Sequence, residues 1–162
     1  MNIPTGETRA TTSGDGLRQS LFVDLLRQFG TAKLAVTGSS MLPAIWPGDV
    51  VTVRRRELSE LRPGQVVLAQ REGKLIAHRI HSIGGDRIIT QGDSLPQCDP
   101  PVCAAEILGE VVSILRHGRY VPVEQSRRQR ALASILRRSD FCARMTLRAG
   151  RRLHRLRSPE SR

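Results

Sequence analysis

The sequence has no long apolar run, and this absence excludes the simplest membrane architectures. No stretch approaches the roughly 18–20 apolar residues that a membrane-spanning helix requires. The first sixteen residues, MNIPTGETRATTSGDG, also lack the apolar core of a secretory signal. Their Thr, Ser and Gly content predicts a flexible arm over residues 1–16. We therefore expect the protein to be located in the cytoplasm.

Cysteine and aromatic residues are scarce as well. Aromatic residues make up 3% of the 162 positions, and the chain has three cysteines, an odd number that argues against a disulfide framework. Cys98 and Cys103 flank a Pro-Pro turn, and we expect both to be free thiols. A C-x4-C pair without further ligands is too little for zinc. The sequence therefore indicates neither a metal site nor a cofactor.

Positive charge is abundant, but it is concentrated at one end of the chain. The formal net charge is +11, and residues 127–162 contribute +10 of it through twelve arginines. Apolar residues alternate with these arginines as in a basic amphipathic helix, which can lie on an anionic membrane surface. A solvated basic tail is the alternative. Nucleic acid is a less favoured partner, because charge alone does not distinguish polyanions and the tail carries no recognition motif.

Between the arm and the tail, residues 17–126 have the pattern of a small β domain. Residues 17–29 have apolar positions at helical spacing, and Gly30 ends this helix. From residue 33 onward, short alternating segments are separated by Gly-containing turns. We predict strands at 33–37, 50–54, 65–71, 74–83, 87–91, 107–116 and 119–123. Such closely spaced strands favour a mainly β fold with a coiled antiparallel sheet or a partly open barrel.

Two adjacent serines occupy a turn in the segment GSSMLPAIWPGDVVTV, residues 38–53. A turn serine commonly bonds its own backbone, whereas a nucleophilic serine requires a base within reach. In LIAHRIHSI, strand alternation places His78, Ile80 and Ser82 on one face and Arg79 and His81 on the other. From spacing alone, His78 and His81 are nearly equivalent as the base.

The segment TQGDSLPQCDPP contributes two carboxylates, Asp93 and Asp99. A carboxylate behind an imidazole fixes its tautomer and stabilises the imidazolium. Asp93 follows a glycine, as in an ordinary Asx turn. Both aspartates therefore compete for the role of orienting a histidine.

Taken together, three segments resemble a known family. GSSMLPAIWPGDVVTV is similar to the nucleophile box of the signal peptidase I and LexA-like serine peptidases, where Ser-Met-x-Pro precedes a Gly-Asp turn and a strand. HRIHSIGGD resembles the next box, with His78 where the bacterial enzymes have a general-base lysine. TQGDSLPQCD followed by ILGEVVSIL resembles the last box. The resemblance covers about residues 34–116 and is greatest to the endoplasmic-reticulum type of signal peptidase, which uses Ser and His.

The resemblance implies a fold of the LexA–signal peptidase type and a set of catalytic roles. Ser40, directly before Met41, matches the nucleophile, and His78 matches the base. By the family pattern Asp99 orients His78, while Asp93 fixes the turn beside the site. Gly38 fills a position that often carries a hydroxyl for the oxyanion. The missing hydroxyl predicts either slower chemistry or compensation by Ser39, since one oxyanion donor typically contributes about 10²–10³ in rate.

The resemblance also implies how a substrate would bind. A peptide or precursor protein would lie as an extended strand beside the Ser40 segment, with small residues before the cleaved bond. We expect an apolar cleft lined by Met41, Pro43, Ile45 and Trp46, although these residues also suit a plain core, above all Ile45. Signal peptidases are anchored by membrane helices, which this sequence lacks, so we expect a cytoplasmic or peripheral enzyme that removes a leader or signal peptide.

Two other functions remain open. A LexA-like regulator would cleave itself and bind DNA, but the first 30 residues are too short for a helix-turn-helix domain. An Ala149-Gly150 bond exists, yet it follows the catalytic body. The second alternative is a non-catalytic binding module, in which the three boxes only shape the β fold and the basic tail binds nucleic acid or a membrane.

Overall fold

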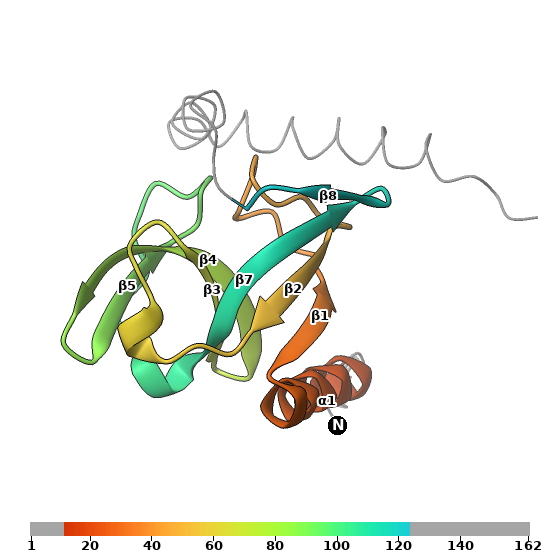
Figure 1. Ribbon diagram of the computed structural model, residues 1–162, viewed down its shortest axis with the longest axis horizontal. Coiled ribbons are helices and arrows are strands. Elements are labelled where there is room, and N and C mark those ends of the chain that lie inside the picture. The colour runs from red at the N-terminus through yellow and green to blue at the C-terminus, as the bar shows by residue number, and fades with distance from the viewer. Residues whose placement is uncertain (1–11, 124–162) are drawn as a thin grey trace, which may run out of the picture.

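The computed structural model describes residues 12–123, which form one antiparallel sheet with a helix beside its first strand (Figure 1). The predicted tail over 127–162 and most of the predicted arm lie outside these residues. In chain order the elements are α1 (Thr12–Phe29), β1 (Thr31–Ala35), β2 (Val50–Arg54), η1 (Leu58–Glu60), β3 (Val66–Arg71), β4 (Lys74–Gly84), β5 (Arg87–Gln91), β6 (Val102–Cys103), η2 (Ala104–Glu106), β7 (Ile107–Arg116) and β8 (Arg119–Val121).

The sheet has the order β1-β2-β7-β3-β4-β5-β6, with β8 paired to β7, and every pairing is antiparallel. The long strand β7 lies between β2 and β3 and so joins the two halves of the sheet (Figure 1). β1 and β6 are the edges, and the sheet does not close into a barrel. The predicted mainly β, coiled antiparallel fold is confirmed.

Two hairpins owe their geometry to two-residue turns. Glu72 and Gly73 join β3 to β4 with φ values of 49° and 71°, and His117 and Gly118 join β7 to β8 with φ values of 49° and 75°. Positive φ at both central residues is the type I′ pattern, whose twist matches that of the flanking strands. Glycine at the second position accepts this backbone without steric cost.

The helix begins earlier than the sequence indicated. α1 starts at Thr12 rather than at residue 17, so residues 12–16 belong to the helix and not to a flexible arm. Thr, Ser and Asp are common in loops but are also favoured at helix N-termini. The other end agrees with the prediction: the N–H of Gly30 donates to the carbonyl of Leu26 over 3.0 Å, and the φ of Gly30 is 69°.

A β-bulge in β4 changes which side chains share a face. Ile80 pairs with Thr90, but Ser82 pairs with Ile89, so His81 is an extra residue. Because Ile89 and Thr90 point to opposite faces, Ser82 lies on the face opposite Ile80 and His78. The predicted placement of Ser82 on the His78 face is therefore wrong, since strict alternation does not continue across the bulge.

Two apolar clusters lie on opposite faces of the sheet. Val66 and Leu68 belong to the larger cluster, which includes buried residues of α1, and Val67 belongs to the smaller one. Successive residues of a strand point to opposite faces, so β3 is buried on both sides.

Over residues 12–123, no helix combines the length and apolar character needed to cross a membrane.

Candidate active site

Ser40 lies in the loop between β1 and β2, where the chain turns tightly. The N–H of Leu42 donates to the carbonyl of Ser39 over 3.2 Å, and the N–H of Ile45 donates to that of Met41 over 2.9 Å. The side chains of Met41 and Ile45 belong to the larger core cluster. This apolar anchorage fixes the backbone of the loop, whereas Ser40 itself remains partly exposed.

His78 lies in the middle of β4 with its imidazole toward Ser40. Its Nε2 is 2.9 Å from the Oγ of Ser40, and the histidine is only 6% exposed. His78 pairs with Val67 of β3, and both strands have further partners in the sheet. The imidazole is therefore attached to an internal strand, which holds it more firmly than a loop would.

Asp99 lies on the other side of the imidazole. Its Oδ2 is 2.6 Å from the Nδ1 of His78, and the hydroxyl of Thr90 donates to the same oxygen over 2.6 Å. The N–H of Asp99 donates to the carbonyl of Thr90 over 2.8 Å, which ties the loop after β5 to that strand. With Nδ1–H donated to the carboxylate, Nε2 carries a lone pair that can accept a hydrogen bond from the Ser40 hydroxyl.

Asp93 has a different partner. Its carboxylate accepts two hydrogen bonds of 2.9 Å from Arg79, one from Nε and one from Nη2, and Asp93 is 0% exposed. Arg79 also donates from Nη1 to the carbonyl of Gly64 over 2.6 Å. The two aspartates that the sequence left in competition are thus separated in space, with Asp99 on His78 and Asp93 on Arg79.

Ser94 contacts the backbone of the candidate nucleophile, and sequence reasoning missed it. Its N–H and its Oγ each donate to the carbonyl of Ser40 over 2.9 Å, and the Oγ lies 3.1 Å from the carbonyl of Ser39. A Cβ on Gly92 would lie 2.8 Å from that Ser40 carbonyl. The Gly-Asp-Ser sequence was the available signal, but serine after a turn has many ordinary uses.

The four residues expected to line an apolar cleft are not equally accessible. Ile45 is 0% exposed and Met41 is 3% exposed, so both belong to the core rather than to a cleft, and Pro43 is buried. Trp46 is partly exposed, and its Nε1–H donates to the carbonyl of Pro43 over 2.9 Å. Only Trp46 of this set presents surface that a peptide could touch in this conformation.

A network at the end of this loop holds Trp46 in place. Arg116 of β7 donates to the carboxylate of Asp49 with a shortest distance of 2.6 Å and to the carbonyl of Ala44 over 2.9 Å. Its guanidinium lies 6.0 Å from the centre of the Trp46 ring. Asp49 in turn accepts the N–H of Trp46 over 2.8 Å. The loop that carries Ser40 is therefore tied to the central strand of the sheet.

The polar groups around His78 show no metal-binding arrangement. Among residues 12–123, no group of three or more His, Cys, Asp or Glu side chains is placed to hold a metal ion. Cys98 and Cys103 are free thiols. A cavity of about 30 Å³ adjoins His78 and Asp99, with apolar walls from Val67 and Val102. It has room for a water molecule.

A family model described as Peptidase S24-like matches residues 11–112, and this span contains Ser40, His78 and Asp99. No curated protein matches the chain.

Proposed function

The chain belongs to the Peptidase S24-like family, and from this premise we propose that it is a serine endopeptidase of the signal peptidase type. Ser40 is the nucleophile, His78 the general base and Asp99 the residue that orients the base. The observation that carries the proposal is the continuous hydrogen-bonded row from Ser40 Oγ through His78 to Asp99, with distances of 2.9 and 2.6 Å.

The Ser40–His78–Asp99 hydrogen bonds support the standard series of acyl-transfer steps. The neutral imidazole takes the Ser40 proton as Oγ attacks the peptide carbonyl, and Asp99 stabilises the imidazolium that forms. The imidazolium then gives its proton to the leaving amine, and water hydrolyses the acyl-enzyme with His78 again as base. The backbone N–H of Ser40 is the oxyanion donor that we assign. Gly38 offers no hydroxyl to add to it, so we expect a modest turnover.

The substrate that we propose is a leader or signal peptide, or another precursor, cleaved after small residues. This step is supported by the sequence resemblance to the Ser-His signal peptidases. The exposed part of Trp46 lies six residues after Ser40 and offers an apolar contact for the peptide. Self-cleavage of the LexA type is the second candidate, and the match to the Peptidase S24-like model supports this candidate as well. Its possible Ala149-Gly150 bond lies outside the described residues.

We predict that Ser40→Ala abolishes cleavage and that Ser39→Ala retains most of it. Of the two adjacent serines, Ser40 has its hydroxyl 2.9 Å from His78 Nε2, and without that hydroxyl the base has no nucleophile to activate. The measurement is mass spectrometry of a peptide library with Ala, Ser or Gly before the central bond. The wild-type chain and the two serine variants are compared at equal concentration.

Equal loss of cleavage in both variants would contradict this assignment. The intact mass of each protein, followed over the same incubation, separates the two candidate functions. Fragments that appear in the wild-type chain but not in Ser40→Ala, with the library left intact, would replace the endopeptidase with a self-cleaving protein. A wild-type chain that cleaves neither itself nor the library would favour the non-catalytic binding module.

A further inference from the structure

One face of α1 presents large apolar side chains to solvent. They follow one another at intervals of four residues, which places them along a single ridge of a helix. Their exposed fractions are 72% for Leu17, 57% for Leu21, 40% for Leu25 and 63% for Phe29. We call these four residues the α1 ridge. Four of the six large apolar residues that are exposed within the described chain belong to it.

The fold does not use the α1 ridge for its own packing. Phe22, Val23 and Leu26 attach α1 to the larger core cluster, and each is at most 5% exposed. An ordinary surface helix has one apolar face and a polar opposite face, whereas α1 has a second apolar face beside the first. Contiguous exposed apolar surface of this kind marks an interaction site.

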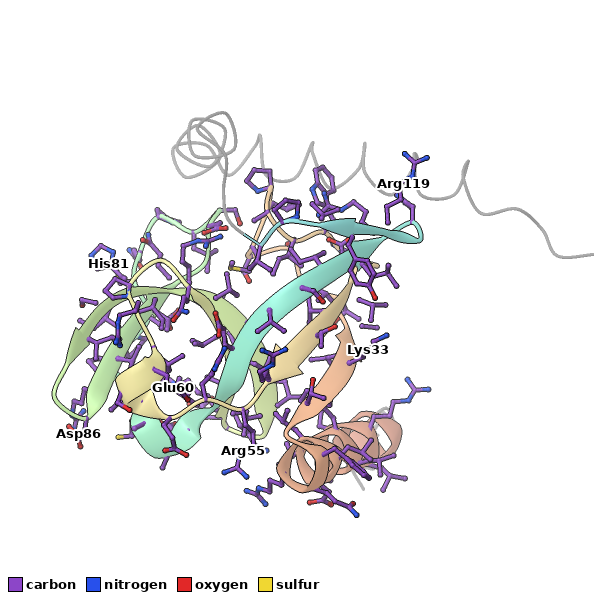
Figure 2. All side chains as sticks on the ribbon, viewed as in Figure 1. Lys33, Arg55, Glu60, His81, Asp86 and Arg119 are labelled. Atoms are coloured by element: carbon purple, nitrogen blue, oxygen red, sulfur yellow. The ribbon has the colours of Figure 1, made fainter. Side chains whose placement is uncertain are left out.

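The charges around the α1 ridge are mostly positive. Arg18 and Arg27 are exposed on the helix, whose acidic residues are Asp15 and Asp24, and Lys33 is exposed on β1. Two further exposed arginines join them from β2 and the residue after it. Arg54 pairs with Thr31, and the N–H of Arg55 donates to the carbonyl of Gly30 over 2.9 Å, so both lie beside the end of α1. Figure 2 shows Arg55 at the α1 end of the molecule.

We propose that the α1 ridge docks on an anionic membrane surface. Leucine and phenylalanine side chains along one face of a helix enter the boundary between headgroups and acyl chains, while flanking arginines contact anionic headgroups. The long arginine side chains reach the headgroups as the apolar ridge is buried. A second copy of the chain fits less well, because pairing two α1 helices would bring the same four arginines of each copy together.

This docking leaves the candidate active site accessible. α1 lies at one end of β1 and the Ser40 loop at the other, so the five residues of β1 separate the helix from the loop (Figure 1). A chain held by α1 would keep the Ser40 loop at the end of the sheet away from the lipid. The docking proposal rests on the α1 ridge and its charges, and it holds whether or not Ser40 is catalytic.

The test compares vesicle binding of the full chain with that of ridge variants. The probe is vesicles of equal parts phosphatidylglycerol and phosphatidylcholine, with pure phosphatidylcholine as the uncharged reference. Leu21→Gln combined with Leu25→Gln should weaken binding to the anionic vesicles at least about tenfold. Tyr120→Gln removes another exposed apolar side chain, 70% exposed on β8, and should leave the affinity unchanged. Equal affinity of the double variant and the wild type would overturn the proposal.

A second measurement reports on α1 directly, whatever the basic tail contributes to binding. In Leu21→Trp, the introduced indole should be quenched by brominated phosphatidylglycerol vesicles well beyond the quenching of Trp46 in the wild type. Quenching no greater than in the wild type would contradict insertion of the α1 ridge. A lipid-free dimer that the double glutamine variant dissociates, without any change in vesicle binding, would instead assign the ridge to a second copy of the chain.

Discussion

Asp93 and Asp99 are six residues apart in the same loop, yet their side chains have different partners. Asp99 contacts the imidazole of His78 and accepts a hydrogen bond from the hydroxyl of Thr90, and its side chain is 20% exposed. Asp93 forms an ion pair with Arg79 and has no exposed surface. A carboxylate on an imidazole changes the chemistry of that imidazole. A buried ion pair instead fixes the positions of the two segments that carry it.

Asparagine substitutions at the two positions should therefore affect different quantities, turnover at Asp99 and stability at Asp93. Asp99→Asn removes the acceptor that holds the His78 tautomer, and we expect turnover to fall by up to about 10⁴ with little loss of stability. Asp93→Asn leaves the Arg79 charge uncompensated beside a buried amide, and we expect a loss of about 3 kcal/mol in the free energy of unfolding. Peptide cleavage and urea unfolding of both variants measure the two quantities.

Each variant serves as the control for the other. If Asp93→Asn were fully stable but inactive, Asp93 rather than Asp99 would act on the base. Loss of stability in Asp99→Asn with turnover intact would reduce Asp99 to a structural residue.

At the level of residues, the sequence supplied candidates but not their geometry. Ser40 and His78 could be selected because short motifs surround them in a fixed order. Spacing left Asp93 and Asp99 in competition, and only the family resemblance favoured Asp99. The contact itself depends on how the loop after β5 folds back on Thr90, and no local pattern encodes that path. Ser94 and Thr90 escaped notice for a related reason. Their hydroxyls act through contacts with residues that are not adjacent in the sequence, and the flanking residues do not predict such contacts.

At the level of elements, two loops from distant parts of the sequence form the candidate site. The loop after β1 carries Ser40, and the loop after β5 carries Gly92, Ser94 and Asp99. Ser94 donates twice to the carbonyl of Ser40, and Gly92 lies against that same carbonyl. The second loop thus contacts both the backbone of Ser40 and, through Asp99, the imidazole of His78.

Gly92→Ala should disturb this contact between the loops. The added Cβ would lie 2.8 Å from the Ser40 carbonyl oxygen and 2.9 Å from two Leu95 atoms, so one of the loops must shift. A shift of about 1 Å at a reacting group can cost about 10²-fold in rate. We therefore expect kcat to fall by that order, and steady-state peptide cleavage measures it.

Gly84→Ala is the matched control, because a Cβ there meets nothing within 4 Å. It should cleave peptide at the wild-type rate. A Gly92→Ala protein as active as Gly84→Ala would show that the contact between the loops does not position Ser40.

Element boundaries were predictable where glycine marked them and less so elsewhere. The turns at Gly73 and Gly118 gave β3, β4, β7 and β8 nearly their observed limits. β6 was missed because two residues carry no alternation, and β1 was placed two residues late because it follows Gly30 directly. The bulge at His81 reflects the register between β4 and β5, which is a tertiary property and leaves no periodic signal.

At the level of the whole molecule, charge and fold are divided along the chain. Residues 1–126 carry 14 basic and 13 acidic groups, whereas residues 127–162 carry twelve arginines against two acids. Both core clusters and the Ser40–His78–Asp99 contacts are made by residues between Phe22 and Val123. The predicted division into a catalytic body over 17–126 and a basic tail stays a prediction, and it has a direct test.

A chain that ends at residue 126 should fold and cleave a small peptide with the kcat/KM of the full chain. Its thermal midpoint and peptide cleavage measure this, with the full chain as reference.

Binding of this shorter chain to anionic vesicles should weaken, because a net charge near +1 gives little attraction between the body as a whole and the headgroups. It should not vanish, since the α1 ridge and its arginines remain. High salt should then release the shorter chain only in part, because apolar insertion is not screened. Unfolding of the shorter chain would mean that residues beyond 126 pack as part of the domain. Steeply salt-dependent binding of nucleic acid by the full chain, with weak vesicle binding, would assign the tail to a polyanion other than lipid.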